Sequence, residues 1–112
     1  MADLSKQEEQ ILLAVWRLGE AAYGVPIRQY LKEVTGRNIS IGGIYVPLDR
    51  LVRKGFLEAE QSDPRPERGG MSRRYYRLTG EGVKVLKASR DVHEKLWDGL
   101  ERIALNARGG RS

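Results

Sequence analysis

The sequence predicts a mainly helical α+β chain with three helices, a β-hairpin and a long final helix within 112 residues. Two observations favour this fold. Apolar residues recur at helical spacing in segments closed by glycine, and an alternating segment is followed by a Pro/Gly-rich break and a second β-rich segment. A chain of this length buries one modest core. We therefore expect one domain at 1–78, a helix at 79–105 and a disordered tail at 106–112.

The first two helices are predicted from caps and apolar spacing. Ser5 and Glu8 have the spacing of a capping box, and apolar residues follow at helical intervals up to Gly19, which predicts a helix over 6–18. Beyond the Tyr23-Gly24 turn, Pro26 suits a first helical turn. Apolar residues then recur at helical spacing until a glycine ends the second helix, at Ile27, Tyr30, Leu31, Val34 and Gly36.

The third helix is predicted to begin at the N-cap Ser40 and to end at Gly55. One apolar stripe supports it, formed by Ile44, Leu48, Leu51 and Val52. Pro47 interrupts this helix, because its ring collides with the carbonyl of Gly43. We expect a bend there rather than a break.

A long β-hairpin with a basic tip is predicted next. Residues 56–60 alternate apolar and polar side chains, 63–70 break regular structure, and 73–78 resume a β-rich run. Alternation along the second strand places Arg73 and Arg77 on one face and Arg74 on the other. These arginines cannot all face one partner, and we expect one of the strand's two tyrosines to belong to the core.

Thr79 is expected to cap a final helix from about Gly80 to Leu105, roughly 40 Å long at 1.5 Å per residue. A helix of that length exceeds what one small domain can cover. Its seam steps by three and four residues, as in a coiled coil. We expect it to form a dimer through Leu86, Ser89, His93, Leu96, Leu100 and Ile103.

Composition excludes several functions. With no cysteine and one histidine, the chain has no disulfide framework and no thiolate or multi-histidine metal site, so we expect no metal and no cofactor. We found no P-loop, nucleophile motif or paired carboxylates, which argues against an enzyme. No apolar run approaches the ~20 residues of a membrane span, and the expectation is a soluble, cytoplasmic protein without a leader.

Positive charge is concentrated in the middle of the chain. The net charge is +5 overall; residues 28–77 carry eleven bases against six acids, whereas residues 1–27 have a net charge of −2. A segregated basic surface attracts polyanions such as nucleic acid, although a merely solvated face is the alternative.

The order of the elements is that of a winged helix-turn-helix, in which the third helix enters the DNA major groove and the hairpin forms the wing. The residues of 8–90 resemble the PadR family of bacterial transcriptional regulators. The matching motifs are Tyr23-Gly24, Ser40-x-Gly42-Gly43-Ile44-Tyr45-x-x-Leu48-Asp49-Arg50-Leu51-x-x-Lys54-Gly55-Phe56-Leu57, Gly69-Gly70 and Arg73-Arg74-Tyr75-Tyr76-Arg77-Leu78-Thr79-x-x-Gly82. This resemblance implies a dimeric repressor of the short form, with one C-terminal dimerisation helix. The sequence departs from the family pattern at one place. The family often has proline directly after the tyrosine of the third helix, whereas here Val46 follows Tyr45 and the proline is Pro47.

Candidate DNA-binding residues follow from this fold. The start of the third helix offers Ser40, Gly42, Gly43 and Tyr45, with packing between helices as the alternative for Tyr45. The basic residues at the end of the third helix are expected either to contact phosphates or to form a solvated face. The wing and its second strand add further arginines. These basic candidates are Arg50, Arg53, Lys54, Arg65, Arg68, Arg73 and Arg74.

The final helix also carries a candidate effector site. Trp97 and His93 either pack in the dimer seam or, with Trp16, line an apolar slot for a small planar aromatic ligand. Short members of the resembled family are similar to ligand-responsive repressors.

The sequence therefore predicts sequence-specific binding of a palindromic duplex operator by a homodimer, with half-sites about one helical turn apart. The alternative function is a winged-helix module that binds a protein partner through the same basic face. Single-stranded nucleic acid is a minor option, suggested by the interleaved arginines and tyrosines of 73–77.

Overall fold

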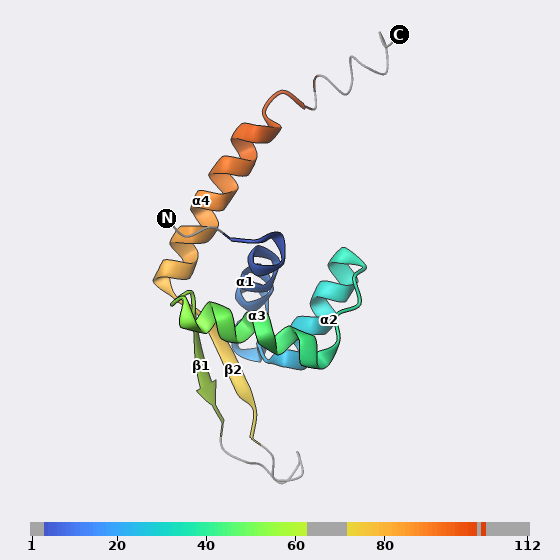
Figure 1. Ribbon diagram of the computed structural model, residues 1–112, viewed down its shortest axis with the longest axis vertical. Helices are drawn as coiled ribbons and strands as arrows, with labels where there is room; N and C mark the ends of the chain where they lie inside the picture. The colour runs from blue at the N-terminus through green and yellow to red at the C-terminus, as the bar shows by residue number, and fades with distance from the viewer. Residues whose placement is uncertain (1–3, 63–71, 101, 103–112) are drawn as a thin grey trace.

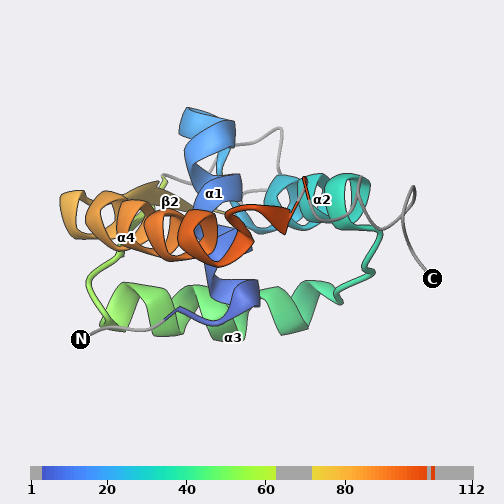
Figure 2. The same cartoon turned by 90° about the horizontal axis from the view of Figure 1, so that it is seen from above.

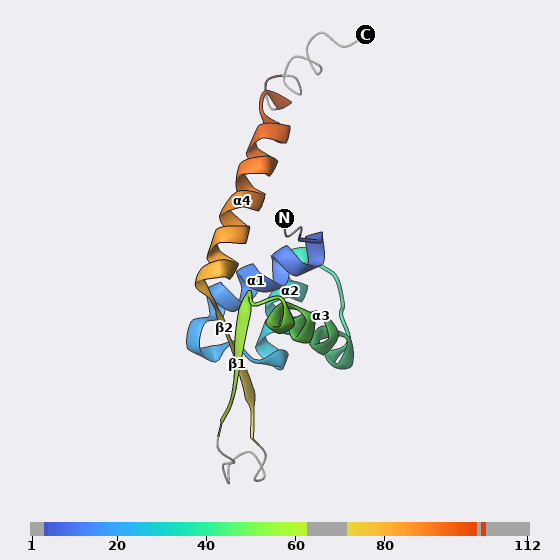
Figure 3. The same ribbon diagram turned by 60° about the vertical axis from the view of Figure 1, so that its left-hand side comes forward.

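The computed structural model confirms the predicted order of elements and describes residues 4–62, 72–100 and 102 (Figure 1). Three helices and a hairpin form a winged helix-turn-helix head. A fourth helix leaves the head on the side opposite the hairpin (Figures 1 and 3).

Helix α1 (Lys6–Leu18) begins with the predicted capping box, in which the Glu8 N–H donates to the Ser5 hydroxyl and the Ser5 N–H donates to the Glu8 carboxylate. A 3₁₀ turn, η1 (Gly19–Ala21), joins it to helix α2 (Gly24–Thr35). Gly36 ends α2 in the left-handed region, at a φ of 76°, where glycine is favoured. Viewed from above, α1 runs crosswise to α3, the third helix (Figure 2).

Helix α3 (Ile41–Arg53) begins at the predicted N-cap Ser40 and continues through Pro47. Pro47 is itself buried. The predicted bend at this residue stays a prediction. The apolar stripe of α3 enters the core as expected, because Ile44, Leu48 and Leu51 have no exposed surface.

The wing is an antiparallel pair of strands, β1 (Leu57–Gln61) and β2 (Arg74–Leu78), in which Leu57 pairs with Leu78 and Gln61 with Arg74. An isolated bridge between Tyr23 and Tyr75 ties β2 to the segment before α2. The tip of the hairpin, residues 63–71, lies outside the described residues.

One hydrophobic core holds the head together. It draws apolar side chains from α1, α2, α3 and both strands: Ile11, Leu12, Ala14, Val15, Ala22, Ile27, Leu31, Ile44, Leu48, Leu51, Phe56, Leu57 and Tyr76. Trp16, although it falls at helical spacing with this stripe, is 57% exposed. One of the two tyrosines of β2 was expected in the core, and the structure shows that it is Tyr76.

Helix α4 (Gly80–Trp97) is shorter than predicted. Its regular backbone stops at Asp98, and Gly99 has a φ of 83°, a conformation that an α-helix cannot include. The predicted helix is therefore interrupted at Gly99, whose stop signal the coiled-coil spacing hid, and its predicted end at Leu105 lies outside the described residues. Leu100 follows this break, whereas Ile103 and the tail at 106–112 lie outside the described residues.

Among residues 4–62, 72–100 and 102, we find no helix with both the length and the apolar character needed to cross a membrane.

Candidate nucleic-acid interface

The start of α3 is a helix N-terminus with little side-chain cover. The Ser40 hydroxyl accepts a hydrogen bond of 2.9 Å from the Gly43 N–H. A side chain at Gly43 would crowd this cap, because its Cβ would lie 2.8 Å from the Ser40 hydroxyl oxygen, whereas Gly42 faces open space. The predicted trio Ser40, Gly42 and Gly43 therefore forms one exposed end, where free N–H groups and the helix dipole favour an anion.

Tyr45 combines the two roles that the sequence left open. Its ring packs against Gly24 so closely that a Cβ there would lie 2.3 Å from the Tyr45 hydroxyl oxygen. The Tyr45 ring therefore needs a glycine at position 24, because any larger residue would overlap with it. The side chain nevertheless stays 36% exposed on the outer part of α3. Tyr45 is therefore packed between helices and also accessible from outside.

The outward face of α3 carries apolar residues that the sequence reasoning missed. Ile41 is 44% and Val46 59% exposed, and both lie off the core stripe. In a major groove, such side chains can contact thymine methyl groups. Their position outside the Ile44, Leu48 and Leu51 stripe was the available signal. Further along, Arg53 is exposed and makes no ion pair with any residue that the structure describes.

Arg50 and Lys54 are not free bases. The Lys54 ammonium lies 2.9 Å from the Glu8 carboxylate and the Arg50 guanidinium 3.7 Å from it, while Glu8 is only 3% exposed. Both bases keep over a third of their side-chain surface exposed. They therefore fasten the end of α3 to α1, and phosphate contact is a second role that stays a prediction.

The electrostatics of this clamp are dominated by Glu8. Burial alone would raise the pKa of its carboxyl, but the Ser5 N–H and the Lys54 ammonium, aided by Arg50, hold the pKa below its ordinary value of 4.5. The carboxylate is thus charged whenever the fold is intact near neutral pH. The sequence showed the capping box, but its spacing alone gave no sign that Glu8 faces α3.

Arg73, which directly precedes β2 on the side of the hairpin tip, stacks with tyrosine rings. The Arg73 guanidinium lies 4.3 Å from the centre of the Tyr23 ring, which meets the Tyr75 ring edge-on at 5.4 Å. Cation–π contact orders an arginine without neutralising its charge. Arg73 therefore stays available to an anion from a fixed position.

Arg74 lies on the opposite face of β2, as alternation predicted. Its guanidinium is 3.6 Å from the Asp49 carboxylate of α3 and 5.6 Å from the centre of the Tyr76 ring. This contact joins α3 and the wing into one surface. The remaining wing candidates, Arg65 and Arg68, lie outside the described residues.

The predicted dimer residues of α4 first meet α1 of the same chain. Ser89 donates a 2.8 Å hydrogen bond to the Glu9 carboxylate, and the His93 Nε2 lies 3.3 Å from the same group. Leu86 is partly buried against the core, whereas Leu96 is 75% and Leu100 42% exposed. The inner half of the predicted seam thus holds α4 on the head, and the outer half is uncovered.

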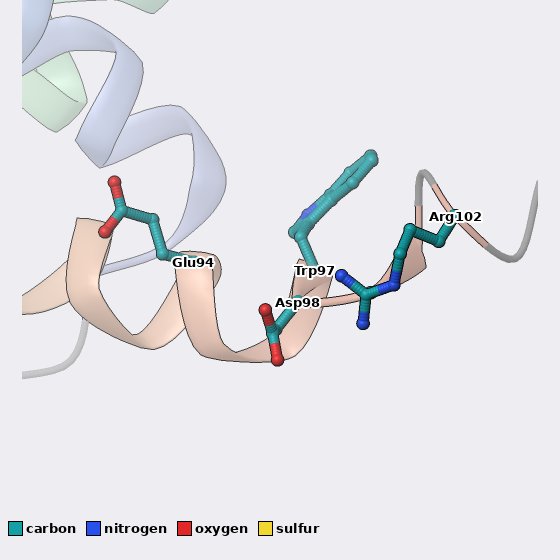
Figure 4. Close-up of a pocket in the computed structure, with 5 residues that line it drawn as sticks. Glu94, Trp97, Asp98 and Arg102 are labelled. Atoms are coloured by element: carbon teal, nitrogen blue, oxygen red, sulfur yellow. The ribbon is translucent and has the colours of Figure 1, made fainter.

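Two of the three predicted effector residues share a groove between α1 and α4. It has a volume of about 400 Å³, and its lining includes Leu13, Trp16, Val83, Leu86 and His93. Trp97 lies elsewhere, in a hollow of about 290 Å³ at the end of α4. That hollow is lined by Glu94, Asp98, Gly99 and Arg102, and the Arg102 side chain extends back toward it (Figure 4).

Comparison with known proteins decides the family. The profile described as "Transcriptional regulator PadR-like family" matches residues 12–88, which include residues 12–18 of α1, all of α2 and α3, and both strands of the wing. The chain belongs to this PadR-like family. Its members are transcriptional regulators, not enzymes, and their function implies DNA binding.

Three solved structures share the fold of this chain. A PadR-like transcription factor from Bacteroides fragilis is 29% identical, with a TM-score of 0.73 over 87% of this chain and 88% of that chain. A PadR family regulator from Eggerthella lenta is 28% identical, with a TM-score of 0.67 over 88% and 83%. RosR of H. salinarum is 29% identical, with a TM-score of 0.69 over 92% and 89%. A search of the curated proteins finds no match.

The Leu78-Thr79-x-x-Gly82 motif of this PadR-like chain fastens α4 to the head. The Thr79 hydroxyl donates to the Gly55 carbonyl at 2.7 Å and accepts from the Gly82 N–H at 3.0 Å. Gly82 lies so close to β1 that a Cβ would be 2.4 Å from the Phe56 carbonyl oxygen. The direction of α4 is therefore set where it leaves the wing.

Proposed function

We propose that this PadR-like regulator is a cytoplasmic repressor that binds a palindromic duplex operator as a homodimer. The observation that supports this proposal best is the surface formed by the open N-terminus of α3, its outward face and the start of β2, joined by the Asp49–Arg74 contact. In a winged helix such a surface suits a major groove and its flanking phosphates. Arg53 and Arg73 supply positive charge there.

The homodimer proposal rests on apolar side chains that the single chain leaves uncovered. On the outer half of α4, Val92, Leu96 and Trp97 are each more than half exposed. Uncovered apolar surface of this kind typically marks an interface. A second copy of α4 offers the same apolar row, and pairing would bring two recognition helices to half-sites about one helical turn apart.

Binding to duplex DNA should weaken steeply as salt rises, because bound phosphates release counterions. Arg53→Ala should weaken binding to all sequences and reduce the salt slope by about one, whereas Ser40→Ala should affect mainly the cognate site. Arg65→Ala with Arg68→Ala should also weaken binding broadly. Fluorescence anisotropy over a salt series measures each effect.

Lys84→Ala is the matched control, since it removes one positive charge from α4, where Lys84 pairs with Glu81. Its salt slope should equal that of the parent protein. Affinity independent of salt, together with a monomer in sedimentation equilibrium, would instead favour the alternative, a module that binds a protein partner.

A second proposed role is relief of repression by a small planar aromatic ligand. Trp16 and His93 support it, because they line one largely apolar groove next to α4. Trp97 lies near the end of the same helix, with its ring 62% exposed. In a dimer, the partner's copy of α4 would cover these rings and could enclose a flat ligand between them.

The two tryptophans of the chain allow this role to be tested directly. Titration of planar aromatic compounds should quench both the Trp16→Phe and the Trp97→Phe variants, because each retains one reporter near the ligand. Saturable quenching should also lower operator affinity. A ligand affinity that is unchanged in Trp97→Ala, measured by quenching of Trp16, would show that Trp97 is not part of the site.

A further inference from the structure

Asp49 is the single acid among the thirteen residues of α3. Leu48 and Leu51 point into the core on either side of it, while Asp49 keeps 49% of its side-chain surface exposed. It lies one turn beyond Tyr45 and one turn before Arg53, on the part of the helix that the proposed function places against DNA. A carboxylate there opposes the attraction of the surrounding bases for phosphate.

Asp49 is held in place rather than free. Arg74 of the wing lies 3.6 Å from its carboxylate, and Arg74 in turn rests over the ring of Tyr76 at 5.6 Å. Tyr76 is 2% exposed, so Arg74 rests on a buried ring. Its hydroxyl has no hydrogen-bond partner among the residues that the structure describes. The carboxylate therefore lies between α3 and the wing, paired with Arg74.

The chemistry of a fixed carboxylate in the major groove is selective. It accepts a hydrogen bond from an amino group, for which the N4 amino group of cytosine is the typical partner. Against a phosphate, or against an acceptor edge such as the O6 and N7 of guanine, it is repelled. Specificity often depends on such a repulsive element as much as on attraction.

We propose that Asp49 is a specificity-determining residue of this regulator, which favours a cytosine at one position of each half-site and rejects duplexes that lack it. Arg74 is its positioning residue. This proposal rests on the proposed function, because it requires α3 to lie in the major groove. Asp49 acts mainly by weakening the binding of non-cognate DNA, which places no amino group where it can donate a hydrogen bond to the carboxylate.

The test compares Asp49→Asn with the parent protein on the selected operator and on operators that carry each base pair at every half-site position. Asp49→Asn should reduce the ratio of cognate to non-cognate affinity about tenfold, within the range of one base contact. The lost preference should fall at a single position in each half-site. Asp49→Glu should restore part of it, and Arg74→Gln should weaken the preference at the same position.

Glu58→Gln is the matched control, because it also removes one acid that pairs with an arginine of the hairpin, at 2.6 Å from Arg77. It should leave the base preference unchanged. Equal effects of Asp49→Asn and Glu58→Gln would overturn the proposal, as would a preference that Asp49→Asn weakens evenly at all positions. If the parent protein selects no operator, the proposed function fails instead, so the two failures are distinguishable.

Discussion

Replacing Glu8 with glutamine should lower the free energy of unfolding by about 2 kcal/mol, a typical value for hydrogen bonds to a charged group. The substitution keeps the side-chain shape but removes the charge that Lys54 and Arg50 share. Both bases remain partly solvated, which limits the loss. Urea unfolding followed by circular dichroism measures it, and Glu20→Gln, an exposed acid of η1, is the control that should change little.

The same substitution should alter the acid side of the stability profile. The folded state holds the pKa of Glu8 below its ordinary value of 4.5, so the unfolded state binds this proton more readily. The stability contributed by Glu8 is therefore present above pH 4.5 and is lost as pH falls through the lowered pKa. Below this window the parent protein and Glu8→Gln should converge in stability; a constant difference down to the lowest pH would contradict the clamp.

Replacing Gly82 with alanine should disrupt the start of α4. The new Cβ would lie 2.4 Å from the Phe56 carbonyl oxygen and 2.7 Å from a Leu78 methyl, distances that require the backbone to move. We expect a loss of about 1 to 3 kcal/mol, typical of overpacking. Because α4 would leave the head in a different direction, operator affinity should fall further than stability alone explains.

Gly80→Ala is the control for this prediction. It lies two residues away in the same first turn of α4, and a Cβ there meets nothing within 4 Å. Alanine should be neutral or slightly stabilising at that position. Equal unfolding curves for the two variants would show that Gly82 does not determine how α4 is attached.

The sequence predicted those parts of the fold that depend on local spacing. Ser5, Ser40 and Thr79 each cap the expected helix, and alternation correctly predicted that one tyrosine of β2 belongs to the core, although it did not say which. The break in the last helix at Gly99 was missed because a coiled-coil pattern was given more weight than this glycine. The coiled-coil spacing and Gly99 were both visible in the sequence, and the left-handed backbone of Gly99 interrupts the helix.

The parts of the site that escaped prediction depend on contacts between distant segments. The α1 residues Glu8 and Glu9 bind α3 and α4 respectively, but no spacing rule connects residues 8 and 54 or 9 and 89. Likewise, the bases Lys54 and Arg50 were assigned to phosphate from their charge alone. Packing decided which arginines and lysines stay available, and it left Arg53 exposed.

Footprinting on genomic fragments retained by the purified protein shows whether this PadR-like chain binds a duplex operator as a dimer. We expect protection of a dyad-symmetric site with half-sites about one helical turn apart and two chains per site. Equal retention of all fragments, with no protected site and one chain per complex, would contradict it.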